Sequence, residues 1–207
     1  MEDQIAILQH AISLREIGEV SESIRLLRDL ERKSLSDEQR AVVLTNLATS
    51  FATQKQFDNA RHEAESALKL LPAEDPLKPY ALLVYAGIMY EQGEVQAAKA
   101  IFEQLLADKL LSEEEHRELW VDALGRLACS LVLLADYRAA LPKLREALRL
   151  SIDPSRTQVL HLNLGIASES MGDEVTAQQE YEAAASGPDP LIRADAHFRL
   201  GRTGAAR

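Results

Sequence analysis

Apolar residues recur at three- and four-residue spacing along almost the whole chain, and short polar turns interrupt them at regular intervals. Near the end of the first quarter of the chain one such stripe runs through Val43, Leu44, Leu47 and Phe51. After the next turn a second stripe runs through Phe57, Ala60, Ala64, Ala67 and Leu68. This spacing is the period of an amphipathic helix. No segment shows sustained two-residue alternation bounded by hairpin turns, so the pattern predicts helices and no sheet.

The turns themselves repeat. A short element recurs as GEV at Gly18, KQF at Lys55, GEV at Gly93, ADY at Ala135 and GDE at Gly172. The steps between these elements are 37, 38, 42 and 37 residues, which indicates five units, each with one helix before the turn and one after it. Glycine suits the left-handed residue that ends the first helix of a pair. Lys55 and Ala135 replace it at a cost of about 1 kcal/mol each if the backbone angle is kept.

Two columns of small residues stay in register with these turns. Seven residues before each turn stand Ala11, Ala48, Ala86, Ala128 and Gly165. Five residues after each turn stand Ser23, Ala60, Ala98, Ala140 and Ala177. Two helices approach to the short end of the usual distance of about 8–10 Å only where small side chains meet. We therefore expect these columns at the crossings within each pair, with larger side chains filling the space between pairs.

Several helix starts carry capping signals. Ser36 with Gln39 and Ser112 with Glu115 are spaced as capping boxes, in which two side chains satisfy backbone N–H groups. Asp153 and Asp189 each precede a proline, which places a favourable N-cap before the first helical position.

The columns resemble the tetratricopeptide repeat, a helix–turn–helix of about 34 residues with a W-x2-L-G-x2-Y…A-x3-F…P pattern. The second unit matches it as L44-x2-L47-A48-x2-F51, followed by Ala60, Ala64, Ala67 and Pro72. The third unit matches as L82-x2-Y85-A86-x2-M89, followed by Ala98, Phe102 and Leu105. The resemblance covers roughly residues 3 to 203. The units are longer than the usual repeat, and in this they are similar to the repeats of kinesin light chains and of bacterial peptide-sensing regulators.

The resemblance implies an all-α fold, a right-handed α-solenoid of about five helix–turn–helix pairs plus a C-terminal capping helix, as one domain over residues 1–207. The repeats are expected at residues 3–35, 37–72, 77–110, 113–152 and 155–187, and the capping helix at 190–203. The fourth unit is expected to begin with an extended first helix that carries Trp120, buried between the third and fourth pairs. In the capping helix we expect Leu191, Ala194, Phe198 and Leu200 inward, with Arg193, Asp195 and Arg199 outward.

Members of this family bind a peptide or protein segment in the concave groove lined by the first helices. In that groove the resemblance places the residue just before the motif leucine: Gln9, Asn46, Val84, Arg126, Asn163 and, in the cap, Arg199. Gaps between them would be filled by Thr49, Thr53, Tyr80, Leu83 and Tyr90. An asparagine there can hold a peptide backbone unit through both atoms of its amide, and an arginine can grip a carboxylate at two points. The alternative is that these polar residues are solvated surface without a ligand.

Composition and charge narrow the function. The 207 residues are 46% hydrophobic and carry 23 Lys and Arg against 33 Asp and Glu, a net charge of −10. Such a balance is typical of a folded protein and argues against nucleic-acid binding, which requires clustered cations. Cys129 is the single cysteine, and it excludes an intramolecular disulfide framework and a Cys-rich zinc site.

No catalytic constellation is evident either. The histidines, His10, His62, His116, His161 and His197, are scattered without metal-ligand spacing on one helix. We therefore expect no metal, no cofactor and no enzymatic activity. The start MEDQIAILQH lacks the features of a secretion signal, and no apolar run approaches about 18 residues, so we expect a cytoplasmic protein with no membrane insertion.

The sequence thus favours a non-enzymatic adaptor that binds a protein or peptide of unknown identity in its concave groove. The alternative is a self-assembling structural module, a homo-dimer that pairs through an end helix or the groove. The first segment, Met1–Ile17, would favour the alternative if it caps the array imperfectly, because it carries Ile5, Ile7, Leu8, Ile12 and Leu14. The adaptor hypothesis expects a monomer in solution.

Overall fold

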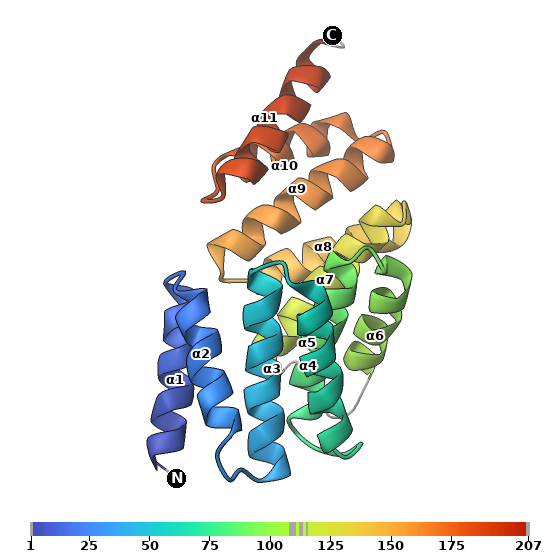
Figure 1. The fold of residues 1–207 in the computed structure, drawn as a ribbon. Helices are drawn as coiled ribbons and strands as arrows, with labels where there is room; N and C mark the ends of the chain where they lie inside the picture. Colours follow the sequence, from blue (N-terminus) through green and yellow to red (C-terminus); the bar gives the residue numbers. More distant parts are fainter. Residues whose placement is uncertain (1, 108–110, 112–113, 115, 206–207) are drawn as a thin grey trace. The chain divides into compact units, whose positions relative to one another are not determined.

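A computed structural model describes residues 2–107, 111, 114 and 116–205, and in this part of the chain every regular element is an α-helix (Figure 1). The helices are α1 (Glu2–Glu16), α2 (Val20–Glu31), α3 (Asp37–Thr53), α4 (Phe57–Leu70), α5 (Lys78–Glu91), α6 (Val95–Ala107), α7 (Arg117–Leu133), α8 (Tyr137–Leu150), α9 (Pro154–Ser170), α10 (Glu174–Ala185) and α11 (Pro190–Ala205). The predicted all-α fold is confirmed.

Contacts divide the chain into two compact units, residues 1–101 and residues 102–207, which we describe one at a time. In the first unit α1 packs on α2 and α3 on α4, while α2 also meets α3 and α4 meets α5. In the second unit α7 packs on α8 and α9 on α10, while α8 meets α9 and α10 meets α11. The first helices of neighbouring pairs also contact each other: α3 contacts α5 in the first unit, and α7 contacts α9 in the second. This is the helix-pair architecture of an α-solenoid, as predicted.

The turns have the backbone conformation that their sequence predicts. Gly18, Gly93 and Gly172 have φ of +89°, +84° and +82°. Lys55 and Ala135 share this left-handed conformation, with φ of +59° and +58°. At Lys55 the turn closes with backbone hydrogen bonds from Lys55 to Ala52 and from Gln56 to Phe51, each 2.9 Å. This is the bonding of a helix that ends in a left-handed residue. The two non-glycine residues therefore keep the turn at the expense of local strain.

The helix starts agree with the capping signals where they can be compared. The Ser36 hydroxyl accepts from the Gln39 amide at 3.2 Å, and the Gln39 side chain accepts from the Ser36 amide at 3.0 Å. Asp153 and Asp189 cap α9 and α11 in the predicted way. The pair Ser112 and Glu115 lies outside the described residues. Glu114 and His116 are not helical and α7 begins at Arg117, so the predicted extension of this first helix is wrong at these positions.

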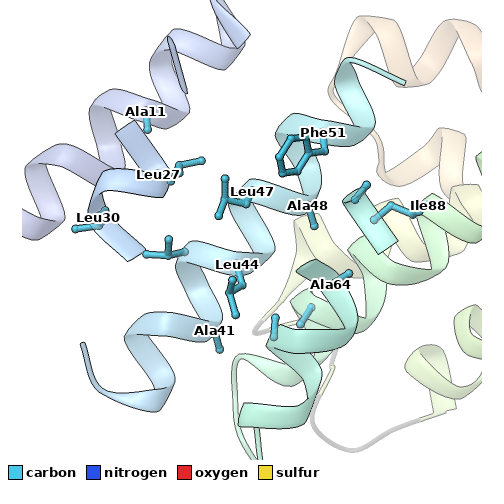
Figure 2. Packing of buried hydrophobic residues seen from close by; sticks show 14 of the residues in the cluster. Ala11, Leu27, Leu30, Ala41, Leu44, Leu47, Ala48, Phe51, Ala64 and Ile88 are labelled. Atoms are coloured by element: carbon cyan, nitrogen blue, oxygen red, sulfur yellow. The ribbon is translucent and has the colours of Figure 1, made fainter. Parts of the chain in front are cut away.

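The small columns lie at the crossings within pairs. Ala48 of α3 and Ala60 of α4 are both fully buried, as are Ala128 and Ala140. Figure 2 shows the packed interior of the first unit, where Leu27, Leu47 and Phe51 fill the space alongside the small residues. In the second unit, a Cβ atom built on Gly165 would lie 2.5 Å from two ring carbons of Tyr181. Small side chains in these columns therefore have the packing role that their spacing indicates.

The inward face predicted for the capping helix is wrong. Leu191 and Phe198 are 80% and 65% exposed, and Ala194 is exposed as well, whereas Ala196 is fully buried. The reason lies in the repeat register. Ala196 occupies the same position in its unit as four residues of the earlier first helices, all of them buried: Val43, Ala81, Ala123 and Leu160. Arg199, expected outward, instead lies with its guanidinium 5.8 Å from the ring centre of Tyr181.

Candidate functional site

The first helices of the second unit share a face that carries a charged network. Arg126 on α7 donates from Nε to Oδ1 of Asp122, 3.2 Å away and one turn earlier on the same helix. The same carboxylate oxygen lies 3.8 Å from Nε of Arg156 on α9. Nη1 of Arg156 also donates to Glu118 of α7 at 3.4 Å. We call the stripe through Asp122, Arg126, Arg156 and Asn163 the α7–α9 face.

Two residues of this face keep polar atoms that are not engaged within the described part of the chain. The side chain of Arg126 is 39% exposed, and only its Nε donates to a described residue. Asn163 lies two turns after Arg156 and so on the same side of α9. Its Nδ2 donates to the carbonyl of Val159 at 2.9 Å, whereas its Oδ1 accepts from none of the described groups. Arg126 thus presents two Nη groups, and Asn163 one acceptor.

Arg199, which the sequence assigned to the same column, is committed to neighbouring side chains. Its Nε donates to Asp195 at 3.0 Å, and its Nη1 lies 3.8 Å from Glu169 of α9. The Tyr181 hydroxyl donates to the same carboxylate at 2.5 Å. Burial, followed by the hydrogen bond to Glu169, raises the pKa of Tyr181. Arg199 therefore fastens α11 to α9 and α10.

Asn46 is closed off in the first unit. Only 3% of its surface is exposed, because its Nδ2 donates to Val42 and its Oδ1 accepts from Arg15 of α1 at 3.3 Å. The same Nη1 of Arg15 lies 3.4 Å from the Asn46 carbonyl oxygen. Sequence reasoning missed Arg15 and Glu169, which both stand six residues after a column member and reach the column member of the next first helix. That shared offset is the signal that could have found them.

The remaining predicted residues differ in accessibility. Leu83 is buried, Tyr80, Val84 and Tyr90 are half-buried, and Gln9 is exposed. Thr49 is half-buried and Thr53 exposed, and each hydroxyl donates to the carbonyl four residues earlier at 2.9 Å. A hydroxyl that has donated its hydrogen can still accept, so the exposed side of α3 offers acceptors rather than donors.

No arrangement for metal binding is present among the described residues, where groups of three potential His, Cys, Asp or Glu ligands are absent. Cys129 is buried, and burial raises the pKa of its thiol to about 12, which keeps it protonated near neutral pH. His161 lies 2.6 Å from Glu180 and joins α9 to α10. Trp120 is half-buried, and its buried Nε1 bonds to none of the described groups. In the described ranges no helix combines the length and apolar character needed to cross a membrane.

Residues 45–110 match the family model of the tetratricopeptide repeat. This segment of the chain carries tetratricopeptide repeats. The chain is similar to the crystal structure of a Podosopora anserina putative kinesin light chain with nearly identical TPR-like repeats, at 19% identity and a TM-score of 0.66 over 95% of each chain. Similarity to the longer repeats of kinesin light chains was predicted from the unit length. No curated protein sequence matches significantly.

Other solved structures share this fold. YrrB, described as a TPR protein with an unusual peptide-binding site, is 14% identical over 95% of this chain and 93% of its own, with a TM-score of 0.59. MamA is 15% identical over 89% of this chain and 91% of its own, also with a TM-score of 0.59. The repeat fold is that of protein-interaction scaffolds, which are typically non-catalytic.

Proposed function

We propose that this protein is a non-enzymatic adaptor whose α7–α9 face binds an extended peptide segment of a partner protein. The observation that carries the proposal is the pair of unengaged groups on this face, the Nη atoms of Arg126 and the Oδ1 of Asn163. The matching residues Asn46 and Arg199 are occupied by other side chains, so binding is expected at the α7–α9 face rather than along the whole column.

The chemistry of these groups indicates the kind of segment. Asp122 holds Arg126 through Nε, which leaves the outer edge of the guanidinium for a ligand carboxylate. Asn163 can accept from a peptide N–H, which every segment offers irrespective of its sequence. Val159 and Ile166 lie on the same side of α9 as Asn163 and are half-buried, so they supply apolar contact. The expected ligand has an extended backbone, one carboxylate and an apolar side chain nearby.

A peptide library displayed on phage would test this function. We expect selection on the wild-type protein to enrich peptides with a carboxylate near an apolar residue. In a fluorescence-anisotropy titration, the double variant Arg126→Ala with Asn163→Ala should bind synthetic copies of these peptides at least tenfold more weakly than the wild type. The control variant Arg117→Ala with Asn59→Ala removes the same residue types at exposed positions outside the face. It should bind the peptides with nearly the wild-type affinity. Peptides that bind the first variant as tightly as the wild type would refute the proposal.

Self-assembly is the second candidate function, and the exposed apolar residues of α11 favour it. Leu191 and Phe198 lie seven residues apart, on one side of a helix that has no following second helix among the described residues. Under this alternative the wild type is a dimer by light scattering after size exclusion, and Leu191→Ser with Phe198→Ser makes it a monomer. A monomeric wild type at high concentration would rule this candidate out in favour of the adaptor.

A further inference from the structure

Helix α8 is basic in an acidic protein. It carries Arg138, Lys143, Arg145 and Arg149 against a single acid, Glu146, while the chain as a whole has a net charge of −10. Arg138, Arg145 and Arg149 are all exposed. They are spaced by seven and four residues, so they lie in one line along the helix and span about 16 Å at 1.5 Å per residue. We call these three residues the arginine stripe.

The arginine stripe is not neutralised within the described part of the chain. None of its three guanidinium groups lies within 4.0 Å of a described carboxylate, and neither does Lys143. The arginines of other second helices behave differently. Arg28 of α2 lies 2.6 Å from Glu63 of α4, and Arg61 lies 3.1 Å from Glu65.

The described acidic groups around α8 do not pair directly with the arginine stripe. Glu146 is exposed on α8 itself, and Asp136 caps the helix by accepting from the Ala139 amide at 3.2 Å. Asp173, before α10, is held mainly by Thr176, and Arg145 adds only a weaker electrostatic attraction that lowers its pKa. The stripe therefore forms no direct ion pair with a described carboxylate.

A second feature of the same surface is a proline in the helix interior. Pro142 is exposed and lies between Arg138 and Arg145 on the same side of α8. A proline here cannot donate the helical hydrogen bond to the Arg138 carbonyl, and an interior proline is strongly unfavourable. Its exposed side chain brings no core packing in return. Local violations of this kind concentrate at functional surfaces.

We propose that the arginine stripe binds an acidic segment of a partner protein, with carboxylates distributed over about 16 Å to match the three arginines. Arginine forms two-point hydrogen bonds with carboxylates, which favours such a segment. Three arginines on a chain of net charge −10 are too few for a long polyphosphate such as nucleic acid, which requires many clustered cations. This site lies on a second helix and is independent of the α7–α9 face of the first helices.

The probe is a short peptide of Glu and Ala whose glutamates repeat at seven- and four-residue spacing, with a Gln-for-Glu peptide as its control. Titrated into ¹⁵N-labelled full-length protein, the acidic peptide should shift amide signals of residues 137–150, and the Gln peptide should not. A triple variant, Arg138→Glu with Arg145→Glu and Arg149→Glu, should bind the acidic peptide at least tenfold more weakly. Each substitution removes one ion pair with the peptide and adds a carboxylate that repels it. Added salt should weaken wild-type binding as well.

The matched control changes the net charge equally at exposed basic residues elsewhere, by Lys33→Glu, Lys69→Glu and Arg117→Glu. Both variants are first checked for wild-type helicity by circular dichroism. The proposal is overturned if the control loses as much affinity as the stripe variant, or if the shifted amides lie on α7 and α9. It is also overturned if a single-stranded oligonucleotide of equal charge binds the stripe as tightly, or if the wild type is a dimer that the stripe variant converts to a monomer.

Discussion

Two glycines in the middle of first helices should respond to alanine in opposite directions. Gly125 of α7 and Gly165 of α9 both lie in helix interiors and are both buried. A Cβ atom on Gly125 would meet the Leu160 side chain at 3.5 Å, an ordinary contact. On Gly165 it would lie 2.5 Å from two ring carbons of Tyr181, closer than packed atoms approach. We predict that Gly125→Ala stabilises the protein and that Gly165→Ala destabilises it.

The magnitudes follow from two opposing effects. Alanine is more favourable than glycine in a helix interior by roughly 0.5–1 kcal/mol. Overpacking a filled core costs roughly 1–3 kcal/mol. Tyr181 cannot move away easily, because its ring is fully buried and its hydroxyl is bonded to Glu169. The net effect should be a loss of about 1–2 kcal/mol for Gly165→Ala and a gain of about 0.5–1 kcal/mol for Gly125→Ala.

Urea unfolding followed by circular dichroism at the helical minimum would measure both changes as shifts of the midpoint. A third variant identifies the cause. Tyr181→Leu removes the ring, so Gly165→Ala should cost much less in that background than in the wild type. Equal costs in the two backgrounds, or a stabilising Gly165→Ala, would refute the packing argument and with it the role assigned to the small columns.

Three further predictions concern single positions and use thermal unfolding. Ala140→Leu overpacks the α7–α8 crossing and should cost roughly 1–3 kcal/mol; a wild-type melting temperature would contradict the register. Gln158→Leu leaves the Ala184 carbonyl and the Asp189 amide and carbonyl without their side-chain partner, which predicts a loss of about 2–4 kcal/mol. The exposed control Gln179→Leu should stay within about 0.5 kcal/mol of the wild type. Pro142→Ala should stabilise the protein, by up to about 3 kcal/mol, and an unchanged melting temperature would show that α8 already accommodates the proline.

The periodic parts of this fold could be predicted from the sequence because each prediction rested on local physics repeated several times. The left-handed conformation of Lys55 and Ala135 follows from their alignment with three glycines, and both residues have it. The Ser36 capping box depends on side chains three residues apart, and it forms. Local rules of this kind are independent of how the helices meet.

The orientation of α11 could not be read from its own sequence. Apolar residues occur on more than one side of this helix, so the stripe through Leu191 and Phe198 was as good a candidate for the core as the side that carries Ala196. The repeat register resolves the choice. The residue three positions before each of Asn46, Val84, Arg126 and Asn163 is buried, and the residue three positions before Arg199 is Ala196. Repeat register is stronger than local apolarity here, because no second helix follows α11 among the described residues to cover its other side.

The candidate site shows where a sequence column stops being informative. A column fixes the direction in which a side chain leaves its helix, and it predicted one role for all its polar members. Partners come from other helices, and they differ from one member to the next. Arg15 binds Asn46, and Glu169 lies against Arg199, whereas Asp122 binds only Nε of Arg126, whose other two nitrogens bond to none of the described groups. The availability of a column residue for a ligand therefore depends on the residue six positions after the preceding column member. Where that residue is an arginine or a glutamate that contacts the column residue, the column residue stabilises the packing of the helices and is not available to a ligand.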